Sequence, residues 1–401
     1  PSSTVYPLSL HESPDFSIVL GGPLYQLWRR SKLCGGVLEL LHRRIIVFTL
    51  LGWVPPLLLS IAEGRAWGGS VKLPFFYDMA VQTRQLIAVP LFLLAELFIH
   101  QWMHPAVAQF LARGLIPDAS RETFNGAIAS ALKLRNAIVP ELLLIVLVYV
   151  IAPAWHNQLV PRDLVSWYGK SVDGKLHLTL AGWWAGYVAL PLFQFLLLRW
   201  YFRLLIWARF LWQVSRIPLQ LIPTHPDRCG GLSFLGIVGQ AFAPLLLAQA
   251  AVMAGRIANR IFANGAQLLE FQVTLVGLVA AMVGLVVGPL LVFMPQLAIA
   301  KFVGLHEYGV LAQRYTREFD QKWLRGGAPA DELLLGSGDI QSLTDLGSSY
   351  EIVTEMRWVP FTIVTLFQLV GITLTPVLPL FLTVIPLEEL IRRLIQTVFL
   401  G

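Results

Sequence analysis

The sequence predicts an all-α integral membrane protein: a polytopic transmembrane helical bundle of about seven spans with a small cytosolic helical subdomain. Only 13% of the 401 residues are Asp, Glu, Lys or Arg, whereas soluble domains carry roughly 25%. Hydrophobic residues make up 56% of the chain and form continuous runs of about 20, the length that crosses a bilayer as a helix. These runs lack the alternating polar residues of a β-barrel. A soluble enzyme and a disordered chain are also excluded.

Four regions follow from these runs. Residues 1–44 form a cytosolic N-terminal segment with an amphipathic, interfacial stretch at 16–33. Residues 45–300 contain spans 1–6, 301–358 a cytosolic helical insert, and 359–401 span 7 with an amphipathic C-terminal helix. The predicted spans are 45–62, 85–103, 137–154, 179–198, 232–254, 272–300 and 359–384. If 359–400 is instead a re-entrant pair, the C-terminus returns to the cytosol. We find no internal repeat.

The distribution of basic residues predicts the orientation. Two thirds of the 30 Lys and Arg residues lie before span 1 or between spans 2 and 3, 4 and 5, and 6 and 7. The positive-inside rule therefore places the N-terminus in the cytosol of a cell (inner) membrane. Anionic lipid headgroups explain the net charge of +6, so no nucleic acid is expected as a partner.

The insert at 301–358 is expected to hold two or three short helices. Leu311, Tyr315, Phe319 and Trp323 recur at helical spacing, which predicts an amphipathic helix. Further on, the pattern Ser348-x-x-Glu351 is typical of a capping box for a helix that runs into span 7.

The densest polar feature inside a predicted span is AELFIHQWMHP. Glu96, His100 and His104 are spaced four residues apart, so they lie within one sector of the helix. Glu141, near the start of span 3, is expected in the same inner leaflet. Buried acids in membranes usually have partners, so we expect either a proton or ion relay through Glu96, His100 and Glu141, or a structural hydrogen-bond cluster that fixes helix packing.

The loop between spans 4 and 5 is the second polar feature. Asp227, Gly230 and Gly231 stand where a turn would cap span 5. Alternatively, the free N–H groups of this turn, with Arg228, form a site for anions or lipid phosphates. Arg199 and Arg203 at the end of span 4 either reach lipid headgroups or form a basic ring that attracts anions.

A metal site is a third alternative, because His, Asp and Cys ligate zinc and similar ions. The residues in question are His100, His104, His225, Asp227 and Cys229. No known metal motif accompanies them, and no other cofactor is predicted.

Glycine and proline interrupt the last two spans. In transporters, such broken helices expose backbone carbonyls to ions. Thr373 and Thr375 in the last span would add hydroxyl ligands to such a pathway.

These features favour a channel or transporter for a small ion or solute, with membrane lipids as partners and a homo-oligomeric assembly. The alternative is a membrane enzyme that acts on lipid or acyl substrates at the cytosolic interface, with or without a metal. The motifs G-x-S-x-G, Walker A and G-x-G-x-x-G are absent, so catalysis is not the favoured function.

Overall fold

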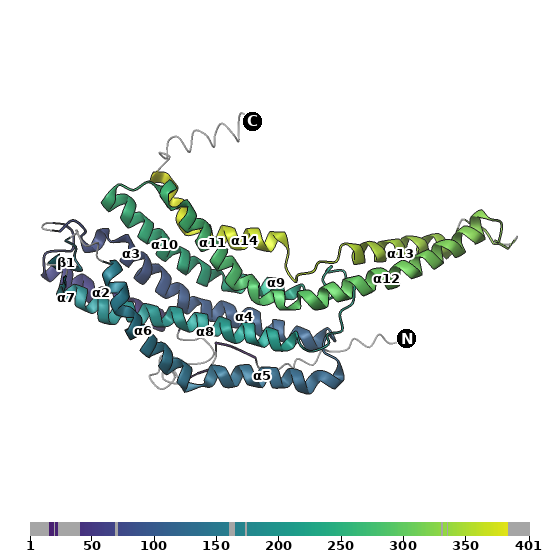
Figure 1. The fold of residues 1–401 in the computed structure, drawn as a ribbon, viewed down its shortest axis with the longest axis horizontal. Coiled ribbons are helices and arrows are strands. Elements are labelled where there is room, and N and C mark those ends of the chain that lie inside the picture. The colour runs from purple at the N-terminus through teal and green to yellow at the C-terminus, as the bar shows by residue number, and fades with distance from the viewer. Residues whose placement is uncertain are drawn as a thin grey trace, which may run out of the picture.

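A computed structural model describes residues 16–19, 21–22, 41–68, 71–159, 165–172, 175–329, 332–334 and 336–383. It confirms an all-α helical bundle (Figure 1). Within the described residues, six helices are long and apolar enough to cross a membrane: Leu41–Ala62, Met79–Ala112, Leu180–Val214, Phe234–Asn264, Leu268–Leu324 and Ile363–Thr383. The remaining predicted span, 137–154, corresponds to α6 (Ile138–Leu159), whose fully described apolar part is Ile138–Val150.

Two consecutive units of the fold share one architecture. In the first, α2 (Leu41–Ala62) leads to α3 (Met79–Gln82), a π-helical turn (Thr83–Ala88) and α4 (Val89–Ala112). In the second, α6 is followed by a hairpin of β1 (Gly169–Val172) and β2 (Lys175–Leu178). Then come α7 (Leu180–Trp184), a π-helical turn (Ala185–Ala189) and α8 (Leu190–Val214).

The match between the two units extends to single residues. The side chains of Asp78 and Thr179 cap α3 and α7 in the same way, each by accepting a backbone N–H three residues on. The sequence Ala-x-Pro-Leu-Phe then ends at Phe92 in α4 and at Phe193 in α8. The expectation of no internal repeat is therefore wrong. The repeat is hard to recognise in the sequence because the motif that the two units share is only five residues long.

Helix α5 (Arg121–Asn136) packs along α8 outside the predicted spans (Figure 1). Phe124, Ala127, Ile128 and Ala131 form its buried face, and Arg121, Glu122 and Lys133 are exposed. Because the continuous helices Met79–Ala112 and Leu180–Val214 measure about 50 Å at 1.5 Å per residue, they exceed a hydrocarbon core of about 30 Å. Both helices are therefore longer than one crossing requires, and α5 packs on α8.

The C-terminal half packs against the first unit through α10. Helices α9 (Phe234–Val238) and α10 (Ala243–Asn264) frame a 3₁₀ turn, and α10 packs against α3 and α4. A 3₁₀ turn (Leu268–Phe271) leads to α11 (Gln272–Val287), and another (Gly288–Phe293) leads to α12 (Met294–Phe319). A π-helical turn, Asp320–Leu324, ends that helix. The chain then forms α13 (Gly338–Thr354), α14 (Ile363–Leu374) and a 3₁₀ segment, Thr375–Thr383.

The expected insert of short helices is in fact a long helical hairpin. Its first arm is the continuation of span 6, since the helix runs unbroken from Leu268 to Leu324. Its second arm, α13, packs back along α12 and projects with it from the bundle (Figure 1). The predicted capping box is wrong, because Ser348 and Glu351 lie inside α13. Near the tip, Lys322 joins the arms by pairing with Asp339 at 2.8 Å.

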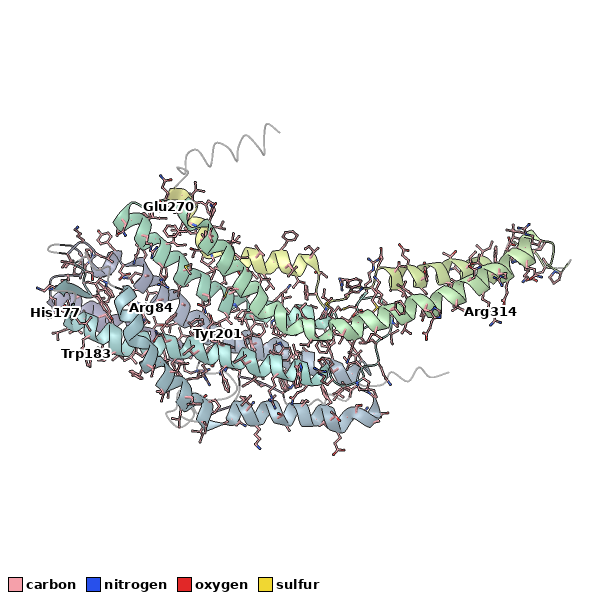
Figure 2. All side chains as sticks on the ribbon, in the orientation of Figure 1. Arg84, His177, Trp183, Tyr201, Glu270 and Arg314 are labelled. Atoms are coloured by element: carbon pink, nitrogen blue, oxygen red, sulfur yellow. The ribbon has the colours of Figure 1, made fainter. Side chains whose placement is uncertain are left out.

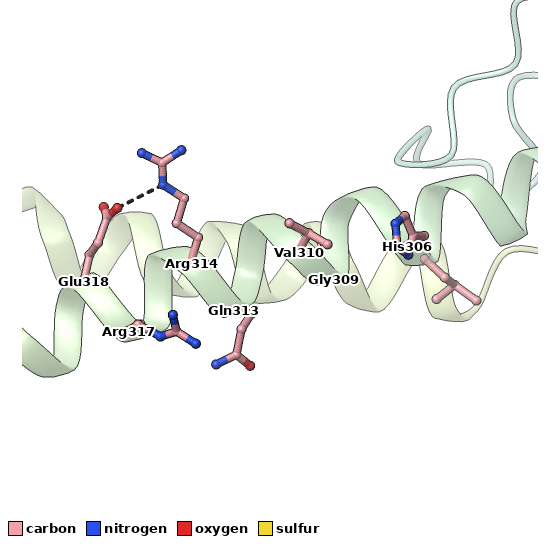
Figure 3. Close-up of a pocket in the computed structure, with 8 residues that line it drawn as sticks. His306, Gly309, Val310, Gln313, Arg314, Arg317 and Glu318 are labelled. Atoms are coloured by element: carbon pink, nitrogen blue, oxygen red, sulfur yellow. Dashed lines mark hydrogen bonds and ion pairs between the residues drawn. The ribbon is translucent and has the colours of Figure 1, made fainter.

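The hairpin surface is charged, and Arg314, Lys322 and Arg325 each form an ion pair within it. Arg314 projects from the hairpin, whereas Tyr201 lies within the bundle (Figure 2). A groove of about 600 Å³ follows α12, and the Arg314 guanidinium donates to Glu318 at 3.0 Å along it (Figure 3).

Candidate functional site

A buried carboxylate surrounded by arginines lies between the two repeated units. Glu96 on α4 accepts from Arg44 on α2 at 2.7 Å, and from Arg199 and Arg203 on α8 at 3.2 and 3.0 Å. Each of these four residues is at most 3% exposed. The basic ring at the end of span 4 therefore does not reach the headgroups, because its two arginines point inward to Glu96.

Glu141 extends the cluster to the second unit. Its carboxylate lies 3.4 Å from Nε of Arg199, and it is 8% exposed. Arg199 thus bridges the two glutamates. Three arginines face two glutamates, so this set carries one net positive charge, and the Arg203 guanidinium also stacks 4.6 Å over the Trp200 ring. We call Arg44, Glu96, Glu141, Arg199 and Arg203 the arginine cluster.

His100 joins the edge of this cluster through the N-terminal segment. Its Nδ1 lies 3.2 Å from the Ser17 hydroxyl, and the Ser17 carbonyl accepts from Arg135 at 2.5 Å. The predicted trio of Glu96, His100 and Glu141 therefore lies in one region.

A small cavity borders the arginine cluster. Its volume is about 10 Å³, room for about one water, and Arg135, Glu141, Arg199 and Arg203 line it with Ile18, Gly21, Phe202 and Ile206.

The loop between spans 4 and 5 forms a tight turn capped by Asp227, the first of the two structures predicted for it. Asp227 accepts backbone N–H groups from Cys229 at 2.8 Å, Gly231 at 3.1 Å and Ser233 at 3.1 Å. Gly230 and Gly231 have φ of +61° and +97°, which suits glycine in so tight a turn. Burial opposes ionisation of Asp227, yet these backbone donors hold the pKa of its carboxyl below the ordinary value.

The same loop leaves little room for the predicted anion site. The N–H of Gly231 already serves Asp227, and Arg228 pairs with Glu355 at 2.8 Å. Arg203 and Arg228 therefore belong to separate ion-pair networks, because one turns into the bundle and the other toward the base of the hairpin.

The residues predicted as metal ligands fall into two places. His100 and His104 have ring centroids 6.1 Å apart on α4. His225 Nδ1 lies 2.9 Å from Asp227, while the Cys229 thiol donates to the carbonyl of Val359. Burial, with the nearby Asp227 charge, raises the pKa of that thiol to about 12. Across the described part of the chain, no group of three or more His, Cys, Asp or Glu side chains is placed to hold a metal ion.

The predicted threonine ligands lie apart from the arginine cluster. Thr373 and Thr375 donate their hydroxyls to carbonyls of their own helix, four residues back, at 2.8 Å each. Their helix, α14, packs on α10 and α11. The prolines of spans 6 and 7 tighten the helix into 3₁₀ turns and do not break it open.

Arg44 and Arg135 are site residues that the sequence predicted only as markers of orientation, whereas Arg199 was expected in the basic ring and not as a partner of Glu96. Their types gave no separate signal, since arginines near span ends usually contact headgroups. No family model matches the chain, and no curated protein and no solved structure matches it either.

Proposed function

We propose that this multi-pass membrane protein conducts or transports a small anion, and that the arginine cluster is its binding station. The observation that carries the proposal is the caging of Glu96 by three buried arginines between the two repeated units. Ionisable groups at membrane depth are costly, and they commonly mark a substrate or ion pathway.

The charge balance supports an anion over a cation. The cluster has one more guanidinium than carboxylate, and Arg135 adds a further cation at its edge. In a medium of low dielectric constant, such an excess attracts anions strongly. Planar guanidinium groups also suit oxyanions, which they bind through two parallel hydrogen bonds.

Glu96 then acts as an internal counter-ion. When no substrate is bound, its carboxylate occupies the donors of Arg199 and Arg203, which matches the closed cavity beside them. An arriving anion takes over those donors, and Glu96 is displaced. By the positive-inside rule, we place this station at the cytosolic end of the pathway.

Anion flux from liposomes containing the purified protein tests this function. Chloride, phosphate and acetate should each be tried, with protein-free liposomes as the baseline. We expect Glu96→Gln to raise the flux of at least one anion, because the arginines lose their competing carboxylate. Arg203→Gln should lower that flux by about tenfold or more, since a charge-assisted hydrogen bond is worth about 1.5–3 kcal/mol.

Arg209→Gln is the matched control on the same helix. Arg209 is exposed and donates only to Ser130 among its described contacts, so flux should stay at the parent level. Equal losses in Arg203→Gln and Arg209→Gln would overturn the proposal. So would the absence of flux of all three anions in both the parent and Glu96→Gln, or a cation flux in their place.

A further inference from the structure

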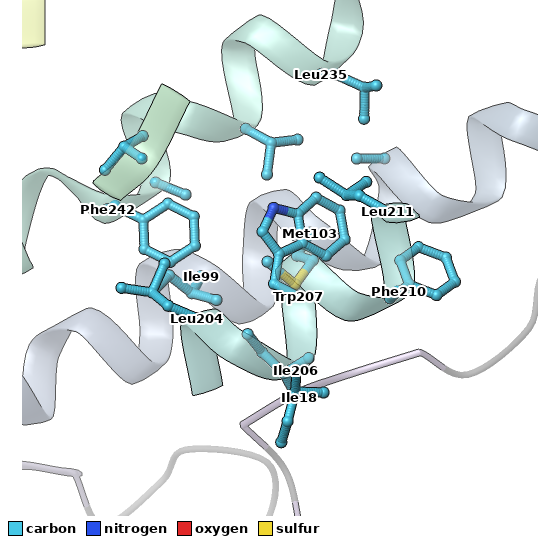
Figure 4. Close-up of a cluster of buried hydrophobic side chains, with 14 of the residues drawn as sticks. Ile18, Ile99, Met103, Leu204, Ile206, Trp207, Phe210, Leu211, Leu235 and Phe242 are labelled. Carbon is cyan, nitrogen blue, oxygen red and sulfur yellow. The ribbon is translucent and has the colours of Figure 1, made fainter. Parts of the chain in front are cut away.

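Residues 16–19 and 21–22 lie at the edge of the arginine cluster, where they contact Arg135 and Arg203. Together we call these described residues the strap. Phe16, Ile18 and Val19 are at most 2% exposed, although the described strap forms neither helix nor strand. The Phe16 ring lies 4.7 Å from that of Phe210, and Ile18 lies beside Ile206 of α8 (Figure 4).

Two backbone carbonyls of the strap accept hydrogen bonds from arginine side chains. The Ser17 carbonyl accepts from Arg135 at 2.5 Å, and the Val19 carbonyl accepts from Arg203 at 3.4 Å. Arg203 is also a ligand of Glu96, so the strap and the carboxylate share one guanidinium. The strap therefore occupies positions that a bound anion would use.

Glycines let the strap backbone approach the site closely. Gly21 has φ of +137°, and a Cβ there would fall 2.6 Å from Cζ of Arg135. Gly22 donates its N–H to Asn136 Oδ1 at 3.1 Å. The strap thus covers the small cavity, which Ile18 and Gly21 help to line.

We propose that the strap is a removable plug that closes the arginine cluster and competes with the anion for Arg135 and Arg203. Its closing role stands on its own contacts, whereas its competition with an anion rests on the proposed function. Hydrogen bonds to an ionised acceptor are roughly twice as strong as those to a neutral carbonyl. An anion that reaches the cluster therefore displaces the strap carbonyls from the arginines. When the anion leaves, the packing of Phe16 and Ile18 on α8 favours the closed position again.

Thiol labelling measures strap opening without reference to transport. Ile18→Cys is made in a Cys34→Ser background, and the purified protein in detergent is treated with a charged maleimide. The native Cys229 is fully buried. We expect Ile18→Cys to react at least about tenfold more slowly than Asn125→Cys, an exposed position on α5, because labelling requires local opening.

Loss of the Arg135 contact should open the strap. Adding Arg135→Gln to Ile18→Cys should speed its labelling by about tenfold, the scale of one lost charge-assisted hydrogen bond. Lys133→Gln, an exposed residue on the same helix, should leave the rate unchanged. Labelling of Ile18→Cys as fast as Asn125→Cys, or a rate indifferent to Arg135→Gln, would overturn the plug.

A reversible crosslink separates the plug from the proposed function. Ser17 and His100 touch through their side chains, so a short bis-methanethiosulfonate can bridge Ser17→Cys and His100→Cys and lock the strap through bonds that a reductant cleaves. We expect the locked protein to lose anion flux and to regain it on reduction. Flux that is equal in the locked and reduced forms would overturn the plug alone. If the parent and Glu96→Gln carry no flux, the proposed function fails, and labelling still decides whether the strap closes the site.

Discussion

The ring centroids of Phe92 and Phe193 lie 5.7 Å apart, and the two residues end the same five-residue motif in the two repeated units. The units therefore meet in register, with α4 and α8 side by side. The indole N–H of Trp200 donates to the Phe92 carbonyl at 2.9 Å, which adds a hydrogen bond to the contact between α4 and α8. Glu96 lies one helical turn beyond Phe92, so the arginine cluster forms at the interface between the units.

The charges of the two units are arranged in opposite order. In the first unit, an arginine on α2 pairs with a glutamate on α4, whereas in the second a glutamate on α6 pairs with an arginine on α8. Arg199 of the second unit also reaches Glu96 of the first, so the two ion pairs join into one cluster.

A double-mutant cycle on Glu96 and Arg203 should show strong coupling. Glu96→Gln leaves three buried arginines short of one counter-ion, so we expect a loss of about 3–5 kcal/mol in the free energy of unfolding. Combined with Arg203→Met, the loss should fall below the sum of the single losses by about 0.5–3 kcal/mol. Denaturant unfolding in detergent measures this. The losses in unfolding free energy for Glu96→Gln and Arg209→Gln should simply add. Additive losses for Glu96→Gln and Arg203→Met would contradict a shared cluster.

The Asp227 turn should make stability depend on acid pH. Backbone donors depress the folded-state pKa of this carboxyl, so its stabilisation is present above the unfolded-state value of about 3.9 and is lost as pH falls through the folded-state pKa. The difference in melting temperature between the parent and Asp227→Asn, measured from pH 7 down to pH 3, should therefore narrow as the pH falls below about 3.9. Asp118→Asn, at an exposed position, serves as the control. A constant gap between parent and Asp227→Asn across this range would contradict the turn's role.

Gly255 should tolerate no side chain at the contact between α10 and the first π-helical turn. A Cβ there would lie 2.6 Å from the Met79 carbonyl and would also clash with Thr83. We expect Gly255→Ala to lower the free energy of unfolding by about 1–3 kcal/mol through overpacking. Gly277→Ala is the matched control, because no atom lies within 4 Å of the Cβ position in that helix. Equal melting temperatures for the two variants would contradict this prediction, because they would mean that α10 can move away from Met79 and Thr83 without a loss of stability.

Much of the architecture was predictable because the membrane imposes a simple rule on composition. Runs of about 20 apolar residues become helices, since no other structure satisfies the backbone hydrogen bonds in lipid. Each predicted span overlaps one of the six candidate membrane helices or α6, although several of these helices extend well beyond the predicted bounds. The helical hairpin was not predictable to the same degree, because nothing local marks whether a helix stops at the membrane surface. Its continuation depends on α13 packing along α12.

By itself, the sequence determined the all-α membrane class, the positions of the spans, and the rarity that made Glu96, His100 and Glu141 stand out. The tertiary structure alone decided their partners. Arg44, Arg199 and Arg203 are far from Glu96 in the chain, and the same arginines would contact headgroups if their helices were rotated outward. Which way they face depends on the registered packing of the two repeated units, a long-range contact for which residue spacing carries no signal.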